Sequence, residues 1–133
     1  KMIVKVKEEA NELLRKGPKK WSTETIIIKR YFLTDLLDDF KGCINPTEGI
    51  FIAQAISIAL SEFVLRVNQK WSGHSKWLYR ALRNYDVDLA NDFVEAFAEY
   101  YKIGKKEKII ELVENILHPY GGTLFQGFSI GKE

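Results

Sequence analysis

The feature that most constrains the fold is a long apolar segment that begins at Asn45-Pro46-Thr47-Glu48 and continues to about Lys70. Its first residues carry three helix-start signals, because Asn45 is a favourable N-cap, Pro46 suits the first turn and Glu48 complements the helix dipole. Its apolar residues cover most of the circumference of a helix that would be on the order of 35 Å long. A helix that is apolar nearly all round is surrounded by other elements, so we expect this one to form the core of a helical domain.

Shorter segments with helical periodicity lie on both sides of the central one. We predict helices at residues 4–16, 23–41, 76–84, 87–101 and 105–117. Ser22, Ser75 and Asp86 are expected to cap three of them, since side-chain oxygens of these residue types accept hydrogen bonds from helix N-termini. Short connections between long helices predict an all-α, up-and-down bundle of four to six helices around the central one. The breakers from His118 onward predict an irregular aromatic tail over residues 118–133.

Composition limits the class of protein. The 133 residues, 46% hydrophobic and 29% charged, suit one folded helical domain spanning residues 1–133. A net charge of +2 is too small to argue for a nucleic-acid partner. The single cysteine, Cys43, indicates a reducing compartment, so we expect a cytoplasmic location. Glu62 and Arg66 interrupt the best apolar run before it reaches the roughly 20 residues of a membrane span, so no span is expected.

The candidate acidic site lies on the helix at 23–41. Asp35 and Asp39 are four residues apart and therefore share a helix face, with Asp38 beside them. Two interpretations remain open. The acids form a solvated face, or one of them binds a cationic or hydroxyl-bearing substrate or acts as a general base.

A second group of candidate residues flanks the turn after the central helix. Arg66 precedes the turn, and Lys76, Arg80 and Arg83 follow it at spacings that share one helix face. Guanidinium groups bind phosphate through paired hydrogen bonds, and Trp77 beside them could stack on a base. The alternative is a solvated basic face with the tryptophan covering a core.

Other motifs carry no chemistry that we can assign. Asp86 and Asp88 have the D-x-D spacing of metal-binding aspartates, but both lie at the start of a predicted helix, where acids are favoured for structural reasons. Carboxylates two positions apart on a helix do not project together. His74 and His118 are too few and too far apart for a metal site, and no catalytic residue or phosphate-binding loop is recognised.

Three blocks of the sequence, taken in order, resemble a known family. They are Gly17-Pro18 with the segment at 30–39 (RYFLTDLLDD), the segment at 71–82 (WSGHSKWLYRAL), and the segment at 118–128 (HPYGGTLFQGF). This order is similar to the C-terminal helical half of bacterial nucleotidyltransferase-domain proteins, akin to the substrate-binding domains of kanamycin nucleotidyltransferases.

The resemblance implies a division of labour. An N-terminal α/β domain, absent from this chain, would supply the Gly-Ser turn and the acids for Mg²⁺ and a nucleoside triphosphate. The helical domain would close over a small-molecule acceptor, with Lys76 and Arg80 near the phosphates and Asp35, Asp39 or Glu62 at the acceptor. Because the sequence starts at Lys1 and not at a methionine, we expect it to be the C-terminal part of a longer polypeptide. Alone, it is not expected to transfer nucleotides or to bind a cofactor.

A second hypothesis belongs to a different class. The chain would be a stand-alone helical interaction module that dimerises through an exposed apolar strip and has no small-molecule site. It predicts a homodimer in solution and no nucleotide binding.

Overall fold

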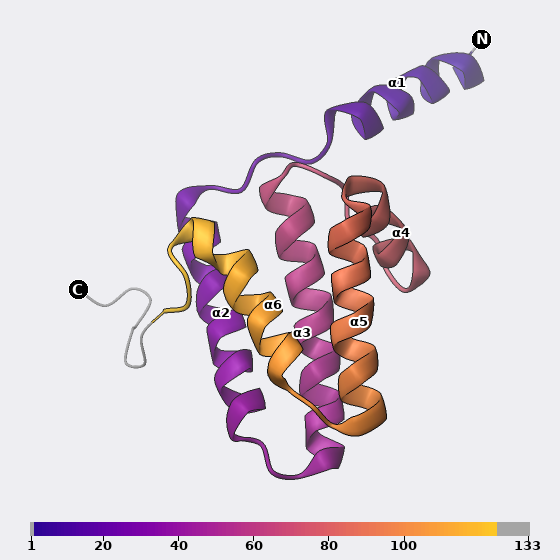
Figure 1. Cartoon of the computed structure of the whole chain (residues 1–133). Helices are drawn as coiled ribbons and strands as arrows, with labels where there is room; N and C mark the ends of the chain where they lie inside the picture. Colours follow the sequence, from indigo (N-terminus) through magenta and orange to yellow (C-terminus); the bar gives the residue numbers. More distant parts are fainter. Residues whose placement is uncertain (1, 125–133) are drawn as a thin grey trace.

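The computed structural model describes residues 2–124, and every regular element in that range is helical. This confirms the predicted all-α bundle around a long apolar helix. The elements are α1 (Met2–Lys16), α2 (Thr23–Gly42), α3 (Pro46–Val67), α4 (Lys76–Tyr85), α5 (Val87–Ile103), α6 (Glu107–Leu117) and the short 3₁₀ helix η1 (His118–Tyr120). Figure 1 shows α2, α3, α5 and α6 as the rods of the bundle, with α4 beside α5 and α1 projecting away.

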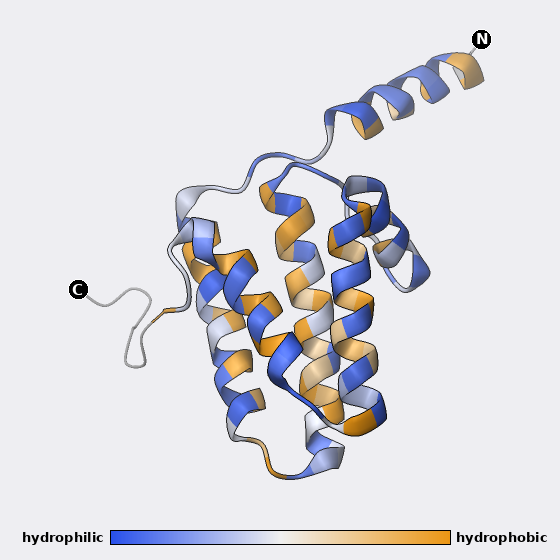
Figure 2. Cartoon of the chain, in the orientation of Figure 1, coloured by the Kyte–Doolittle hydropathy of each residue, from blue (hydrophilic) through white to orange (hydrophobic). Residues whose placement is uncertain are grey.

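The core forms around α3, as its apolar pattern predicts. The Asn45 side chain accepts hydrogen bonds from the backbone N–H groups of Thr47 and Glu48, which fixes the start of the helix. Apolar colour runs along α3 in Figure 2. The buried apolar residues of the four main helices are Leu33, Leu37 and Phe40 of α2, Ala53, Ile56, Leu60, Phe63, Val64 and Leu65 of α3, Ala90, Phe93, Ala96, Phe97 and Tyr100 of α5, and Ile109, Leu112, Val113 and Leu117 of α6.

Two details of α3 differ from expectation. Its circumference is not fully enclosed, because Phe51 and Ile58 on one face are 69% and 55% exposed. The helix also ends at Val67, short of the predicted Lys70. Gln69 turns into the left-handed region with φ of 55°, and the Lys70 N–H donates back to the Leu65 carbonyl at 2.8 Å. This hydrogen bond closes the helix with a Schellman-type turn.

The sequence-based exclusion of a membrane span was too strong. Helix α3 is long enough and apolar enough to meet the length and composition criteria for crossing a membrane. One such helix is weak evidence for a span, because the core helix of a soluble protein meets the same criteria. Its position at the centre of the bundle is that of a core helix.

Helix α1 does not join the bundle. Leu13 and Leu14, which sequence spacing places on its apolar stripe, are 61% and 65% exposed. Within the described residues, only the C-terminal end of α1 is bonded to the segment that follows α3, because the indole N–H of Trp71 donates to the Leu13 carbonyl at 3.0 Å. Gly17 follows with φ of 80°, and a Cβ there would lie 2.0 Å from the Gln69 carbonyl oxygen. Only glycine fits this junction between the end of α1 and the end of α3.

After α6 the chain makes a turn of 3₁₀ helix over His118–Tyr120, where the sequence predicted no helix at all. Gly121 and Gly122 then take positive φ values of 108° and 79°, which directs the chain back along α2. The remainder of the predicted aromatic tail, including Phe125 and Phe128, lies outside the described residues.

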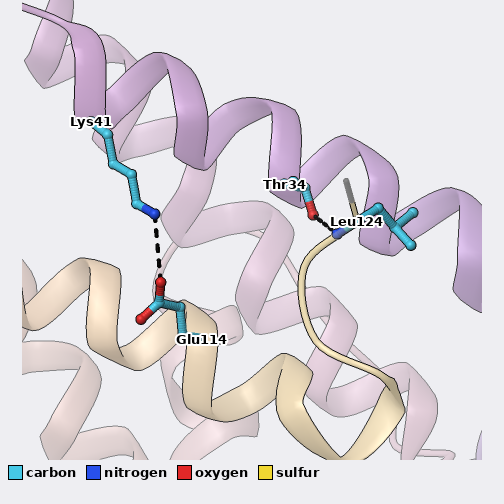
Figure 3. A network of polar contacts seen from close by, with 4 residues as sticks. All are labelled: Thr34, Lys41, Glu114 and Leu124. Carbon is cyan, nitrogen blue, oxygen red and sulfur yellow. Dashed lines mark hydrogen bonds and ion pairs between the residues drawn. The ribbon is translucent and has the colours of Figure 1, made fainter. Parts of the chain in front are cut away.

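The returning chain is fixed to α2 by two hydrogen bonds. The Arg30 Nε donates to the Gly122 carbonyl at 3.0 Å, and the Leu124 N–H donates to the Thr34 hydroxyl at 3.0 Å. Figure 3 shows the second of these contacts beside the ion pair that joins Lys41 of α2 to Glu114 of α6.

Candidate functional site

A polar cluster lies where the N-terminal end of α2 meets the C-terminal end of α3. It consists of Trp21, Lys29, Glu62 and Arg66, and we call it the α2–α3 polar cluster. The Lys29 ammonium lies 4.0 Å from the Glu62 carboxylate, and the two side chains are 41% and 40% exposed. Lys29 and the Arg66 guanidinium lie 5.4 Å and 5.3 Å from the centre of the Trp21 ring, which brings two cations to one aromatic surface.

The helix framework explains this geometry. Glu62 and Arg66 are four residues apart on α3 and therefore share a face. Trp21 stands directly before the cap residue Ser22, whose side chain accepts from the Thr25 N–H, so the start of α2 fixes the indole. The indole packs edge-on against Phe63 at 6.0 Å.

Arg66 has one donor without a partner. Its Nε is buried and forms no hydrogen bond within residues 2–124. A buried N–H of a guanidinium is costly to leave unsatisfied. The guanidinium of this half-buried side chain lies against the Trp21 ring, so packing positions the cation.

Sequence reasoning identified Glu62 and Arg66 but missed their two neighbours. Trp21 carried a usable signal, because an apolar residue directly before an N-cap commonly packs on the first turns of the helix. Lys29 carried no signal, since only the pairing of α2 with α3 brings it to Glu62.

The predicted residues of α4 form a separate group. Lys76 and Arg80 both lie over the Trp77 ring, at 5.6 Å and 4.8 Å from its centre, and the ring is 58% exposed. Arg83 lies over Tyr79 instead, at 6.0 Å. No hydrogen bond, ion pair or ring contact in the described chain joins this group to the α2–α3 polar cluster.

The start of α4 also differs from prediction. Ser75 makes no capping hydrogen bond from its side chain and takes a φ of 59°, whereas Asp86 caps α5 as predicted by accepting from the Leu89 N–H at 3.1 Å. This capping role supports the structural interpretation of the D-x-D spacing.

The remaining predicted residues, Asp35 and Asp39, are exposed on α2. Their four-residue spacing places them on one face, and neither forms a hydrogen bond or ion pair with another described residue. Phe32, which is exposed, is three residues before Asp35 and therefore lies on the same face of α2. The structure therefore leaves these acids solvated and available.

Comparison with known proteins gives no family assignment. No model of a known protein family matches the chain, and neither a curated protein nor a solved structure matches it.

A protein site for a metal ion needs several donor side chains close together. Among residues 2–124, no group of three or more His, Cys, Asp or Glu side chains is arranged to hold a metal ion. The described residues therefore do not fit the Mg²⁺ that the resemblance implies for the complete enzyme, and we derive no step through it.

Proposed function

We propose that this chain is the substrate-binding helical domain of a nucleotidyltransferase that transfers a nucleotidyl group to a hydroxyl-bearing acceptor. The observation that carries the proposal is the half-exposed pair of Lys29 and Glu62, 4.0 Å apart, with Arg66 on the same α3 face. The sequence resemblance supports the same assignment.

The chemistry of the cluster suits both halves of such a substrate pair. The Glu62 carboxylate can accept a hydrogen bond from an acceptor hydroxyl or pair with an acceptor amine. Arg66 and Lys29 can attract nucleotide phosphates, for which guanidinium offers paired N–H donors. An ion pair this exposed contributes about 0–1 kcal/mol, so a ligand displaces it at little cost.

The other predicted residues take supporting roles in this proposal. Asp35 and Asp39 attract a cationic acceptor, and Lys76 and Arg80, stacked on Trp77, attract phosphate from the α4 side. The metal-binding acids and the Gly-Ser turn belong to a catalytic domain elsewhere in the polypeptide or in a partner. When bound there, Mg²⁺ would neutralise the charge that develops on the transferred phosphate. The single Cys43, which has no disulfide partner, supports a cytoplasmic location.

A stand-alone dimerisation module is the second candidate. It is favoured by the exposed stripe of α1, where Ile3 and Leu14 are 71% and 65% exposed. Under the first proposal this stripe packs on the catalytic domain, whereas under the second it packs on another copy of the chain.

The test starts from the polypeptide that naturally contains this chain at its full length. The protein is incubated with Mg²⁺, an α-labelled nucleoside triphosphate and a panel of hydroxyl-bearing acceptors that includes kanamycin. We expect label to move to an acceptor. If that polypeptide carries no catalytic domain, transfers no label and sediments as a dimer, the second candidate replaces the first.

A further inference from the structure

A cleft between α3, α4 and α5 lies outside the α2–α3 polar cluster. Its volume is about 370 Å³, within the usual range of about 300–1,000 Å³ for small-molecule sites. It is lined by none of the substrate-binding residues predicted from the sequence, which are Asp35, Asp39, Glu62, Arg66, Lys76, Trp77 and Arg80. We call it the α3–α5 cleft.

The walls of the cleft are mainly apolar and aromatic. Phe93 and Phe97 of α5 contribute stacked rings 6.2 Å apart, and Leu78 of α4 also lines the cleft. Val94, 51% exposed, and Tyr101, 49% exposed, line it from the same helix as the two phenylalanines. Such walls favour a flat apolar ring system.

One side of the cleft is polar but uncharged. Ser57 and Ser61 are four residues apart on α3 and both line the cleft. A serine inside a helix commonly bonds to the carbonyl four residues earlier, as the Thr34 hydroxyl does to Arg30. Ser57 and Ser61 form no hydrogen bond within the described chain, although Ser61 is only 4% exposed. Their hydroxyls therefore keep their donors and acceptors for a molecule in the cleft.

The absence of charged residues from the cleft lining disfavours charged ligands. All twelve residues that line the cleft are described, and none of them is Lys, Arg, His, Asp or Glu. A phosphate or ammonium group placed there would lose its hydration without gaining a partner of opposite charge. A neutral ligand avoids that loss.

We propose that the α3–α5 cleft is a binding site for an uncharged aromatic heterocycle that carries hydroxyl or amino groups. The ring packs between Leu78 and the two phenylalanines, and its polar edge bonds to the Ser57 and Ser61 hydroxyls. The site shares no lining residue with the α2–α3 polar cluster, and it adjoins the α4 cations only through Tyr79, which lines the cleft and lies 6.0 Å below Arg83.

The test titrates the ¹⁵N-labelled chain with adenosine, a neutral heterocycle with hydroxyl groups, and follows amide chemical shifts. AMP, which adds only a charged phosphate, is titrated in parallel. We expect saturable shifts centred on Ser57, Ser61 and Phe97, and weaker binding of AMP at this site. Loss of nucleotidyl transfer in the full-length protein would not affect this result, so the two proposals fail separately.

Matched variants on α5 locate the site. Val94→Trp should close the mouth of the cleft and weaken adenosine binding by at least about tenfold. Val87→Trp, also on α5 and 56% exposed but outside the cleft, should bind like wild type. Ser57→Ala should weaken binding with little risk to folding.

The proposal would be overturned by the absence of saturable shifts with adenosine at millimolar concentration. Tighter binding of AMP than of adenosine at the cleft, or equal binding by Val94→Trp and Val87→Trp, would overturn it as well. A dimer that Val94→Trp dissociates would also overturn it, because the cleft would then be covered by a second copy of the chain.

Discussion

The Tyr100 hydroxyl occupies the space where a side chain at Gly49 would be. A Cβ built on Gly49 would lie 2.1 Å from that oxygen and 3.8 Å from the Cys43 sulfur. The Tyr100 ring is also held by Phe40, whose ring centre is 4.9 Å away. The first turn of α3 and the last turns of α5 therefore meet at a point where only a glycine fits.

Gly49→Ala should destabilise the fold. Overpacking costs about 1–3 kcal/mol, and the better helix propensity of alanine returns only about 1 kcal/mol. We expect a loss of about 1–2 kcal/mol in the free energy of unfolding, measured by urea denaturation. Gly42→Ala is the control, since nothing lies within 4 Å of a Cβ there, and it should leave stability unchanged or slightly higher. Adding Tyr100→Phe should restore part of the loss, and no restoration would contradict this explanation.

Two positions on α3 should differ sharply in their tolerance of truncation. Leu60 is fully buried, whereas Ile58, two residues earlier, is 55% exposed. Leu60→Ala should therefore cost about 2–5 kcal/mol of unfolding free energy, and Ile58→Ala about 0.5 kcal/mol or less. Equal losses in chemical denaturation would mean that the face of α3 assigned to the core is wrong.

Alkaline pH should weaken the fold through Tyr100. Burial, with a smaller contribution from Cys43, raises the pKa of the Tyr100 phenol above its ordinary 10.0. The Tyr100 pKa is higher in the folded state than in the unfolded state, so the neutral phenol favours folding. This stabilisation is complete below pH 10.0 and is lost as pH rises through the folded pKa. Burial shifts the pKa values of Tyr101 and Tyr120 in the same direction. Urea midpoints should fall more steeply with alkaline pH in wild type than in Tyr100→Phe, and identical slopes would contradict the assignment.

The return of the chain onto α2 depends on Thr34. Its hydroxyl donates to the Arg30 carbonyl at 2.8 Å and accepts from the Leu124 N–H at 3.0 Å, as Figure 3 shows for the second contact. Thr34→Val keeps the shape but leaves the Leu124 N–H without this acceptor, at a cost of about 1 kcal/mol. Amide exchange at Leu124 should accelerate in Thr34→Val and not in the exposed control Thr47→Val. Unchanged exchange at Leu124 would show that the contact does not hold the chain.

Much of the fold follows from local sequence signals. The Ser22, Asn45 and Asp86 caps were predicted correctly because each acts within three residues of itself. The predicted Ser75 cap was wrong because the Ser75 backbone has a positive φ, which the residue type alone does not indicate. The apolar pattern of α3 identified the core helix but not its open face, since the number of neighbours that cover a helix is a tertiary property.

The candidate site was harder to predict for the same reason. Glu62 and Arg66 lie four residues apart on one helix, so their spacing alone places them on one face, but Lys29 reaches Glu62 only through the packing of α2 on α3. The α3–α5 cleft combines residues from three helices and has no linear motif. Helix α1 has the pattern of a packed helix, yet nothing in its own sequence specifies which surface covers it.

The most direct test of the nucleotidyl-transfer proposal is kcat/KM for label transfer by the full-length polypeptide carrying Glu62→Gln. A matched control is Glu95→Gln, which alters an acid that pairs with Lys108 at 3.1 Å on a different part of the bundle. If Glu62 binds the acceptor, kcat/KM should fall by at least about tenfold in Glu62→Gln and stay near wild type in Glu95→Gln. Equal kcat/KM values for Glu62→Gln and wild type would contradict the central claim.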